Sequence, residues 1–213
     1  MRKEVFVLIL ALALIVAGCK GGEKGALSSA ATPFIGGTEG VRISFLENAP
    51  PRETLDNPKP ADKSQISNFD IALRVENVGE QKIPANTLNV IIGGIYSSDF
   101  NIPNPKTAFL TKNLAQELEG VRKDPEGERL PGGIDEVTFQ DLAYVKSLEG
   151  NSEFPIQADV CYPYKTRAVA DFCMRKELTK ATAGVCQIKG SKPAFSSGGP
   201  IQVTSFEEAV GGT

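Results

Sequence analysis

The 213-residue chain contains no histidine and no tryptophan. The absence of histidine excludes Ser-His-Asp and Cys-His nucleophile pairs, histidine-ligated zinc and histidine general bases. The chain also lacks the motifs Gly-x-Ser-x-Gly, Ser-x-x-Lys, Gly-Lys and Gly-x-Gly. Hydrolase nucleophiles and nucleotide-binding loops depend on these motifs. The sequence therefore predicts a protein that is not an enzyme and that has no cofactor.

The chain also lacks a marked excess of one charge. Its formal net charge is −3, and its lysines and arginines are scattered rather than interleaved with aromatic residues. This distribution predicts no nucleic-acid partner. The 21 glycines and 14 prolines indicate many turns and argue against a helical bundle.

The N-terminus has the features of a lipoprotein signal peptide. Arg2 and Lys3 are followed by thirteen apolar residues, Val5–Ala17, too few for a membrane-spanning helix. The sequence VAGC at Val16–Cys19 resembles a lipobox, which predicts cleavage before Cys19 and a lipid on its thiol. The alternative is an uncleaved anchor in which Cys19 is incidental. Either interpretation places the rest of the chain outside the cytoplasmic membrane and close to it.

Composition divides the chain into five segments. We predict a signal peptide (1–18), a flexible tether (19–40), a β-sandwich domain (41–190), a linker (191–199) and the first strand of a truncated second domain of the same kind (200–213). The tether is rich in Gly, Ala, Ser and Thr and cannot bury a core. The linker includes Ser196–Gly199 (SSGG).

Short segments of alternating apolar and polar residues dominate from Val41 onward. The clearest runs through Phe69, Ile71, Leu73 and Val75, and the others that we expect to be strands are centred on Val41–Phe45, Leu88–Ile92, Val137–Phe139, Ile156–Tyr164 and Ala168–Met174. Short alternating strands separated by turns are typical of an antiparallel β-sandwich. We expect Asn48–Asn68 to form an exposed loop. Lys106–Arg122 is compatible with a helix or with a strand followed by a turn at Asp124–Gly127.

Three motifs resemble an immunoglobulin-like, adhesion-related (CARDB-like) domain of archaeal and bacterial surface proteins. These are FDIALRVENVGE (Phe69–Glu80), LPGGIDEVTF (Leu130–Phe139) and VCYPYKTRAVADFC (Val160–Cys173), the last similar to archaeal surface proteins. The resemblance spans roughly Val41–Lys189. It implies an immunoglobulin-like fold and a cell-surface location, and it implies no catalytic residues.

Residues 200–210 repeat residues 40–50. The segments GVRISFLENAP and PIQVTSFEEAV align with identical Glu47/Glu207 and Ala49/Ala209 and with similar residues at three further positions. The repeat predicts that a second domain begins at Pro200. A strand without a sheet cannot satisfy its backbone, so we expect residues 200–213 to be disordered or loosely docked. A chance similarity between two amphipathic strands is the alternative.

The acidic residues and two tyrosines are the candidates for a binding site. The carboxylates Asp56, Asp62, Asp70, Glu117, Glu119, Asp135 and Glu136 follow no EF-hand spacing, and solvated surface charge explains them better than calcium or a glycosidase pair. Tyr162 and Tyr164 could stack on a sugar, but their place on the apolar face of a strand favours a core role. We predict no metal site.

Three cysteines follow Cys19, namely Cys161, Cys173 and Cys186. An extracytoplasmic location permits a disulfide. If Ile156–Tyr164 and Ala168–Met174 pair as a hairpin with their apolar faces aligned, Cys161 lies opposite Cys173. We therefore expect a Cys161–Cys173 bond, with Cys173–Cys186 as its main competitor.

Together these features predict a non-catalytic lipoprotein that is anchored to the cell membrane and serves envelope architecture or adhesion. Its partners would be the membrane, reached through the N-terminal lipid, and an envelope protein or glycan. The alternatives are a solute- or glycan-binding lipoprotein, and an accessory subunit of a surface machine such as a pilus or transporter.

Overall fold

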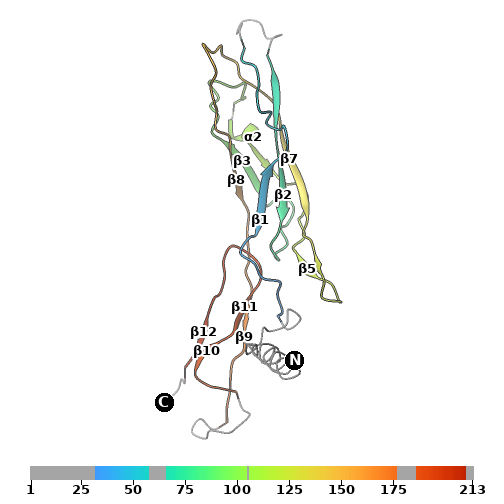
Figure 1. Ribbon diagram of the computed structural model, residues 1–213, viewed down its shortest axis with the longest axis vertical. Helices are drawn as coiled ribbons and strands as arrows, with labels where there is room; N and C mark the ends of the chain where they lie inside the picture. Colours follow the sequence, from blue (N-terminus) through green and yellow to red (C-terminus); the bar gives the residue numbers. More distant parts are fainter. Residues whose placement is uncertain (1–31, 58–65, 105, 177–185, 210–213) are drawn as a thin grey trace, which may run out of the picture. The chain divides into compact units, whose positions relative to one another are not determined.

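The computed structural model describes residues 32–57, 66–104, 106–176 and 186–209, and its regular structure is almost entirely β (Figure 1). All strand pairs are antiparallel, which confirms the all-β class expected from the alternating segments. The predicted signal peptide, Cys19 and most of the predicted tether lie outside the described residues.

The elements are, in chain order, β1 (Val41–Phe45), β2 (Asn68–Asn77), β3 (Asn89–Gly93), α2 (Lys106–Leu110), β4 (Thr111–Asn113), β5 (Arg122–Lys123), β6 (Arg129–Leu130), β7 (Ile134–Ala143), β8 (Gln157–Cys161), β9 (Ala168–Ala170), β10 (Gly190–Lys192), β11 (Ala194–Ser196) and β12 (Phe206–Glu208). They fall into two regions of one compact unit that begins at Pro33. We call residues 41–161 the sandwich and residues 164–209 the C-terminal ribbon.

The sandwich contains two three-stranded sheets, with strand orders β1-β2-β7 and β4-β3-β8. Alternate residues of β2, β3 and β7 point into a common core, because successive side chains of a strand face opposite sides. Those with almost no exposed surface are Ile71, Leu73, Val75, Val90, Ile92 and Phe139. The alternating segments predicted as strands at Phe69–Val75, Leu88–Ile92 and Val137–Phe139 thus form the centre of the fold.

Two contacts show which sheet edges are neighbours. On one side, Lys112 of β4 donates from Nζ to the carbonyl oxygen of Thr138 in β7, at 2.5 Å. On the other, the backbone N–H of Val41 in β1 donates to Oη of Tyr162, just after β8, at 3.1 Å. The edges β1 and β8 therefore lie together at one side of the sandwich, and β4 and β7 lie together at the other.

The stretch Lys106–Arg122 contains both kinds of structure in short pieces, separated by irregular backbone. A single helical turn, α2, precedes β4, and Leu118 then forms an isolated bridge with Ile83. The turn expected at Asp124–Gly127 joins β5 to β6. A helix around Leu114–Val121 does not form, because these residues add to the edges of the core instead.

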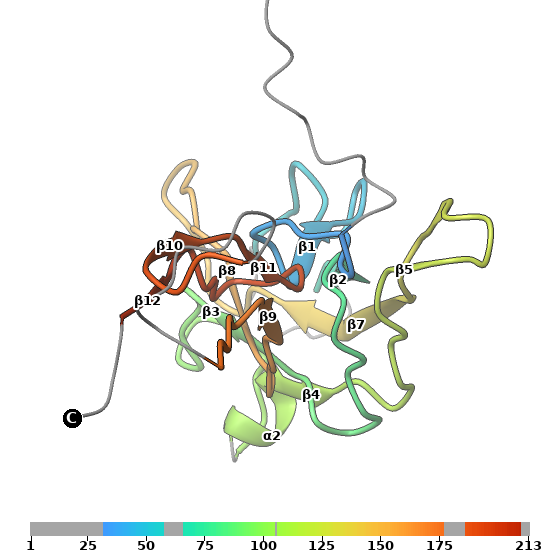
Figure 2. The same ribbon diagram turned by 90° about the horizontal axis from the view of Figure 1, so that it is seen from below.

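The ribbon consists of two strand pairs, β9 with β11 and β10 with β12 (Figure 2). The hairpin expected between Ile156–Tyr164 and Ala168–Met174 is wrong. β8 pairs with β3, which places Val160 opposite Val90, and β9 pairs with β11. Residues 190–196, expected to end the domain and begin a linker, form β10 and β11.

Residues on both sides of the predicted domain boundaries make contacts within this unit. The backbone N–H groups of Ile35 and Gly36, expected to belong to the tether, donate to the carboxylate of Glu80. In the repeat segment at the C-terminus, a strand forms over Phe206–Glu208, whereas the part aligned with β1 begins at Ile201. The two similar segments therefore pair differently: β1 pairs with β2, whereas β12 pairs with β10.

Candidate functional site

Several of the acidic residues that were candidates for metal ligands or a catalytic pair have partners within the protein. Asp56 accepts a hydrogen bond from the backbone N–H of Leu148 at 2.7 Å, and Asp70 accepts one from Asp141 at 3.0 Å. Within the described ranges, no group of three or more His, Cys, Asp or Glu residues could hold a metal ion. Asp62 lies outside those ranges.

Glu117 and Glu119 share one cation. Lys82 Nζ lies 2.7 Å from Glu117 Oε1 and 3.0 Å from Glu119 Oε1, and these hydrogen bonds raise the pKa of the lysine above its ordinary value. All three side chains are about half exposed. An exposed ion pair of this kind contributes little to stability.

The disulfide joins Cys173 to Cys186, and Cys161 is a free, exposed thiol on β8. The predicted pairing of Cys161 with Cys173 is wrong, and its competitor is the one that forms. The reason is the strand pairing: β8 lies against β3, where Cys161 is opposite Asn89. The Cα atoms of Cys173 and Cys186 are 5.8 Å apart, within the usual range for a disulfide.

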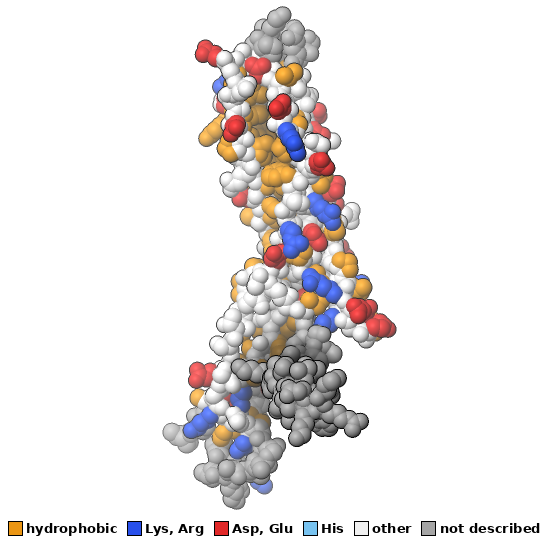
Figure 3. All heavy atoms as spheres, viewed as in Figure 1, with side chains coloured by type: hydrophobic (Ala, Val, Ile, Leu, Met, Phe, Trp, Pro, Cys, Tyr) orange, Lys and Arg blue, Asp and Glu red, His pale blue; other side chains and the backbone are white. Residues whose placement is uncertain are grey.

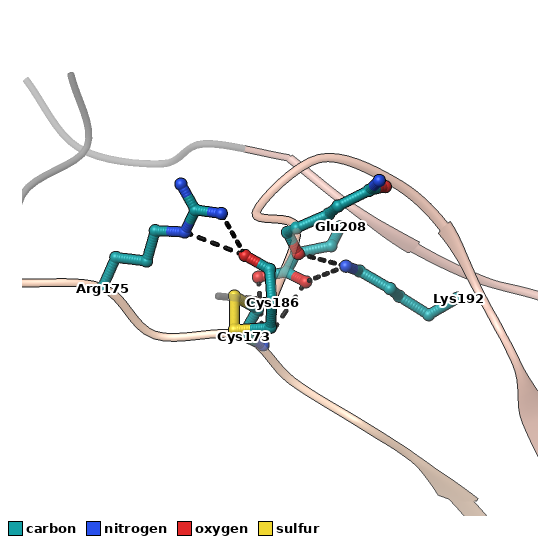
Figure 4. Close-up of a disulfide and its surroundings, with 6 residues drawn as sticks. Cys173, Arg175, Cys186, Lys192 and Glu208 are labelled. Atoms are coloured by element: carbon teal, nitrogen blue, oxygen red, sulfur yellow. Dashed lines mark hydrogen bonds and ion pairs between the residues drawn. A yellow bond between two sulfur atoms is a disulfide. The ribbon is translucent and has the colours of Figure 1, made fainter. Parts of the chain in front are cut away.

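Charged side chains hold the backbone around this disulfide (Figure 4). Glu208, buried at the end of β12, accepts a hydrogen bond from the backbone N–H of Cys173 at 3.3 Å and lies 3.4 Å from Lys192 Nζ. Arg175 donates from Nε to the carbonyl oxygen of Cys186 at 2.8 Å. A buried carboxylate needs such partners to offset its desolvation. This arrangement ties three segments of the ribbon together.

Glu80 joins the ribbon to the sandwich. Glu80 lies shortly after the end of β2 in the sequence. Its carboxylate accepts hydrogen bonds from the backbone N–H groups of Ile35, Gly36 and Gly198. The backbone N–H of Glu80 also donates to the carbonyl oxygen of Gly198 at 3.2 Å. One carboxylate thus binds backbone from two segments that lie more than 160 residues apart in the sequence. We call this point the Glu80 junction.

Tyr162 and Tyr164 pack against the Glu80 junction. Their rings meet edge to face with centroids 5.8 Å apart, and Tyr164 Oη donates to the carbonyl oxygen of Gly198. A Cβ atom at Gly79 or Gly199 would collide with the Tyr164 ring or hydroxyl, so these positions require glycine. Partial burial raises the pKa of both tyrosines. Both rings are partly buried: Tyr162 packs on the edge of the hydrophobic core, as the core interpretation expected, whereas Tyr164 packs against the junction.

Several large apolar side chains remain exposed, and many of these lie in the ribbon. The ribbon exposes Val169, Phe172, Met174, Ile201 and Val203. Phe172 and Met174, expected on the apolar face of a strand against β8, are uncovered because that strand pair does not form. The sequence pattern identified these positions as apolar without identifying what would cover them.

Comparisons with protein-family models, with curated proteins and with solved structures find no match for this chain. No helix in the described part of the chain has the length and apolarity needed to cross a bilayer. The structure therefore defines an all-β protein with one disulfide among its described residues, and its features must be interpreted from its own side chains.

Sequence reasoning did not identify Glu80, Lys192 or Glu208, which connect segments that are distant in the sequence. Each is a single charged residue among many, and no spacing distinguishes it. The only available signal for Glu80 was its place directly after the longest alternating run, at the sequence Asn77–Glu80 (NVGE). That position marks the end of a strand and carries no information about a distant partner.

Proposed function

We propose that this protein is an extracytoplasmic lipoprotein, anchored to the cell membrane through lipid on Cys19, whose immunoglobulin-like sandwich is a non-catalytic module of envelope architecture or adhesion. The observation that carries the proposal is the Cys173–Cys186 disulfide in a chain whose N-terminus resembles a lipoprotein signal peptide. Disulfides form and persist in oxidising compartments. Secretion by the N-terminal segment and formation of this bond are consistent with each other.

The strand order supports the immunoglobulin-like assignment. In that fold the first, second and fifth strands share one sheet, and the third and sixth share the other. Taking β1, β2 and β7 as the first set, and β3 with β8 as the second, reproduces this division. β4 then lies beside β3, where variable-type domains place an extra strand. The resemblance of Phe69–Glu80 and Leu130–Phe139 to adhesion-related domains falls on β2 and β7 of this arrangement.

A structural or adhesive role fits the contacts of the acidic residues and tyrosines, which bind other parts of the protein. The carboxylates Asp56, Asp70, Glu117 and Glu119 all have protein partners. The tyrosines that could have stacked on a sugar pack against backbone at the Glu80 junction. The partners that we propose are the membrane, reached by the N-terminal lipid, and an envelope component that binds the surface of the sandwich.

The free thiol of Cys161 provides a test of location. Cells that express the full chain are treated with a membrane-impermeant maleimide, and we expect Cys161 to be labelled without cell lysis. Cys161→Ser should abolish the label, because Cys173 and Cys186 are bonded to each other. Labelling only after lysis would contradict the extracytoplasmic location.

The anchor is tested separately by the intact mass of protein isolated from its native host. Cleavage before Cys19 with added lipid supports the proposal. Cys19→Ala should yield released protein or an unprocessed precursor. A chain that still begins near Met1 and fractionates with membranes would favour the uncleaved anchor.

A further inference from the structure

Two neighbouring edges of the sandwich have no strand partner among the described residues. β1 pairs only with β2, and β8 pairs only with β3. The exposed backbone edge of a strand is a template for pairing with another chain. Since β1 and β8 lie at the same side of the sandwich, their unpaired edges are neighbours, joined at one end by the hydrogen bond from Val41 to Tyr162; we call the strip between the two edges the opening.

The opening is lined by apolar side chains that the core does not fully cover. Val41 and Ile43 of β1, and Ala158 and Val160 of β8, pack on the core but are only partly buried. Phe45, at the end of β1, is 43% exposed. Figure 3 shows hydrophobic side chains reaching the surface of the sandwich on the face that carries β1 and β8 in Figure 1.

The position next to β8 is the one that an immunoglobulin-like sandwich fills with its seventh strand. In that fold the last strand pairs with the sixth, which corresponds to β8. Here the chain leaves β8 for Tyr162 and Tyr164 and enters the ribbon, so this position is empty of described strands. The unpaired edge of β8 therefore lacks the strand that an immunoglobulin-like fold would place there. Strand addition by another segment can fill such a position.

The chain itself contains a segment suited to this opening. Ile201 and Val203 are 70% and 44% exposed, and residues 201–205 belong to no strand. In the repeat they align with Val41 and Ile43, which pack on the core from β1. An extended segment over Ile201–Ser205 spans about 17 Å, which is enough to cover the five residues of β8.

Contacts within the chain hold this segment against the ribbon and against Gly37, so that it does not pair along β8. The Val203 N–H donates to Ser196 Oγ, and the Ile201 carbonyl oxygen accepts from Thr166 Oγ1. β12, which follows, pairs with β10. The donor of the strand should therefore be another molecule.

Charge favours the approach of a second copy. Residues 164–213 contain seven lysines and arginines against four aspartates and glutamates, whereas residues 41–163 contain twelve against nineteen. A basic ribbon that carries the donor segment thus meets an acidic sandwich that carries the opening. Complementary charge of this kind steers association and fixes orientation.

We propose that Ile201–Ser205 of a second copy adds as a strand along β8, with Ile201 and Val203 directed between β1 and β8. The inference rests on the immunoglobulin-like assignment proposed above. Because donor and acceptor are different surfaces, the contact is head to tail and can repeat from molecule to molecule. Such an array would give the protein its role in envelope architecture.

The test uses Cys161, which is exposed on β8, and the variant Thr204→Cys. When Val203 points inward, residue 204 points outward, to the same face as Cys161. The chain from Lys20 onward retains the whole compact unit that begins at Pro33 and needs no lipid. Isotopically labelled and unlabelled chains are mixed under mild oxidation, and peptide mapping identifies the bonds formed. We expect a disulfide between Cys161 of one chain and the introduced thiol at position 204 of another, joining a labelled to an unlabelled chain.

The matched control is Ser97→Cys, which places a thiol at an exposed turn of the sandwich. Its yield of bonded dimer should be far lower. Adding Val203→Asp to Thr204→Cys should reduce the dimer about tenfold or more, because a carboxylate would be buried in the opening.

Three results would overturn the proposal. The first is a dimer yield no higher than that of Ser97→Cys, and the second is a yield unchanged by Val203→Asp. The third is a bond from Cys161 to the introduced thiol that forms only within single chains. Since the assay uses unlipidated protein, its failure is separate from a failure of the anchor.

Discussion

The sandwich and the C-terminal ribbon are stabilised in different ways. Every buried apolar side chain of the described residues lies between Phe69 and Tyr144, with the single exception of Cys173. The ribbon exposes Val169, Phe172 and Met174, and its buried groups are Cys173, Ser197, Glu208 and glycine backbone. The sandwich therefore relies on apolar burial, whereas the ribbon relies on a disulfide and on polar contacts.

This difference follows from how much surface each region can bury. Ten-residue strands such as β2 and β7 present several inward residues to one core. The ribbon strands have three residues each, too few to build a core. Small structures of this kind depend on covalent cross-links. The same reasoning explains why the disulfide lies in the ribbon and not in the sandwich.

The largest expected effect is a core substitution in the sandwich. Phe139 is almost fully buried, and Phe139→Ala should lower the free energy of unfolding by about 3–5 kcal/mol, through lost burial and a cavity. Phe172→Ala is the matched control in the ribbon. With 68% of its surface exposed, Phe172 should contribute less than about 0.5 kcal/mol. Urea unfolding measures both, and equal losses would contradict the comparison.

The next effect is the loss of the disulfide. Cys173 and Cys186 are 13 residues apart, and closing a loop of this size is worth about 3 kcal/mol on the chain-entropy estimate. The paired substitution Cys173→Ser with Cys186→Ser should expose the ribbon to limited proteolysis while leaving the sandwich resistant. Cys161→Ser serves as the control and should change neither region. Cleavage that begins within β2 or β7 would show that the disulfide supports the sandwich instead.

The Glu80 junction links the two regions and should have an intermediate effect. Glu80→Gln keeps the shape but replaces one acceptor oxygen by a donor that faces backbone N–H groups. Charged hydrogen bonds of this kind contribute about 1.5–3 kcal/mol each at most, so we expect a total loss of about 2 kcal/mol. Glu119→Gln, at an exposed ion pair, should cost less than about 0.5 kcal/mol. Similar values for the two variants in urea unfolding would argue against the junction.

The smallest effect concerns the tyrosine that packs on the junction. Tyr164→Phe removes the hydroxyl that donates to Gly198 and should cost about 1 kcal/mol. It should also change the response to alkaline pH. Burial raises the pKa of Tyr164 above its ordinary value of 10.0, so its contribution is complete below pH 10 and is lost as pH rises through the folded-state pKa. The decline of unfolding free energy above pH 10 should be shallower in Tyr164→Phe, and an identical decline would contradict this assignment.

The local pattern of apolar and polar residues was sufficient to predict the sandwich strands but not to predict which strands pair. The alternation at Phe69–Val75 and at Val137–Phe139 predicted β2 and β7, because side-chain period determines which face is buried. The partner of β8 is β3, which lies more than sixty residues earlier in the sequence. The alternation of apolar and polar residues in either strand does not indicate which strand it pairs with. The error in the disulfide followed directly from the hairpin assumed between neighbouring segments.

The polar contacts could not be predicted from the sequence for a related reason. Glu80 and Glu208 acquire their roles from backbone groups that arrive from distant segments. A single chain with no repeated motif around these residues provides no spacing by which to detect them. Composition likewise places Gly198 and Gly199 in a linker, whereas Gly199 is required because the Tyr164 ring leaves no space for a side chain.

The most direct test of the different stabilisation of the two regions is hydrogen exchange, measured amide by amide in the presence and absence of a reductant. We predict that reduction of Cys173–Cys186 accelerates exchange in β9–β12 and leaves the amides of β2 and β7 protected, since the sandwich core does not depend on the disulfide. Loss of protection in β2 and β7 to the same extent as in the ribbon would contradict the account, as would unchanged protection throughout the chain.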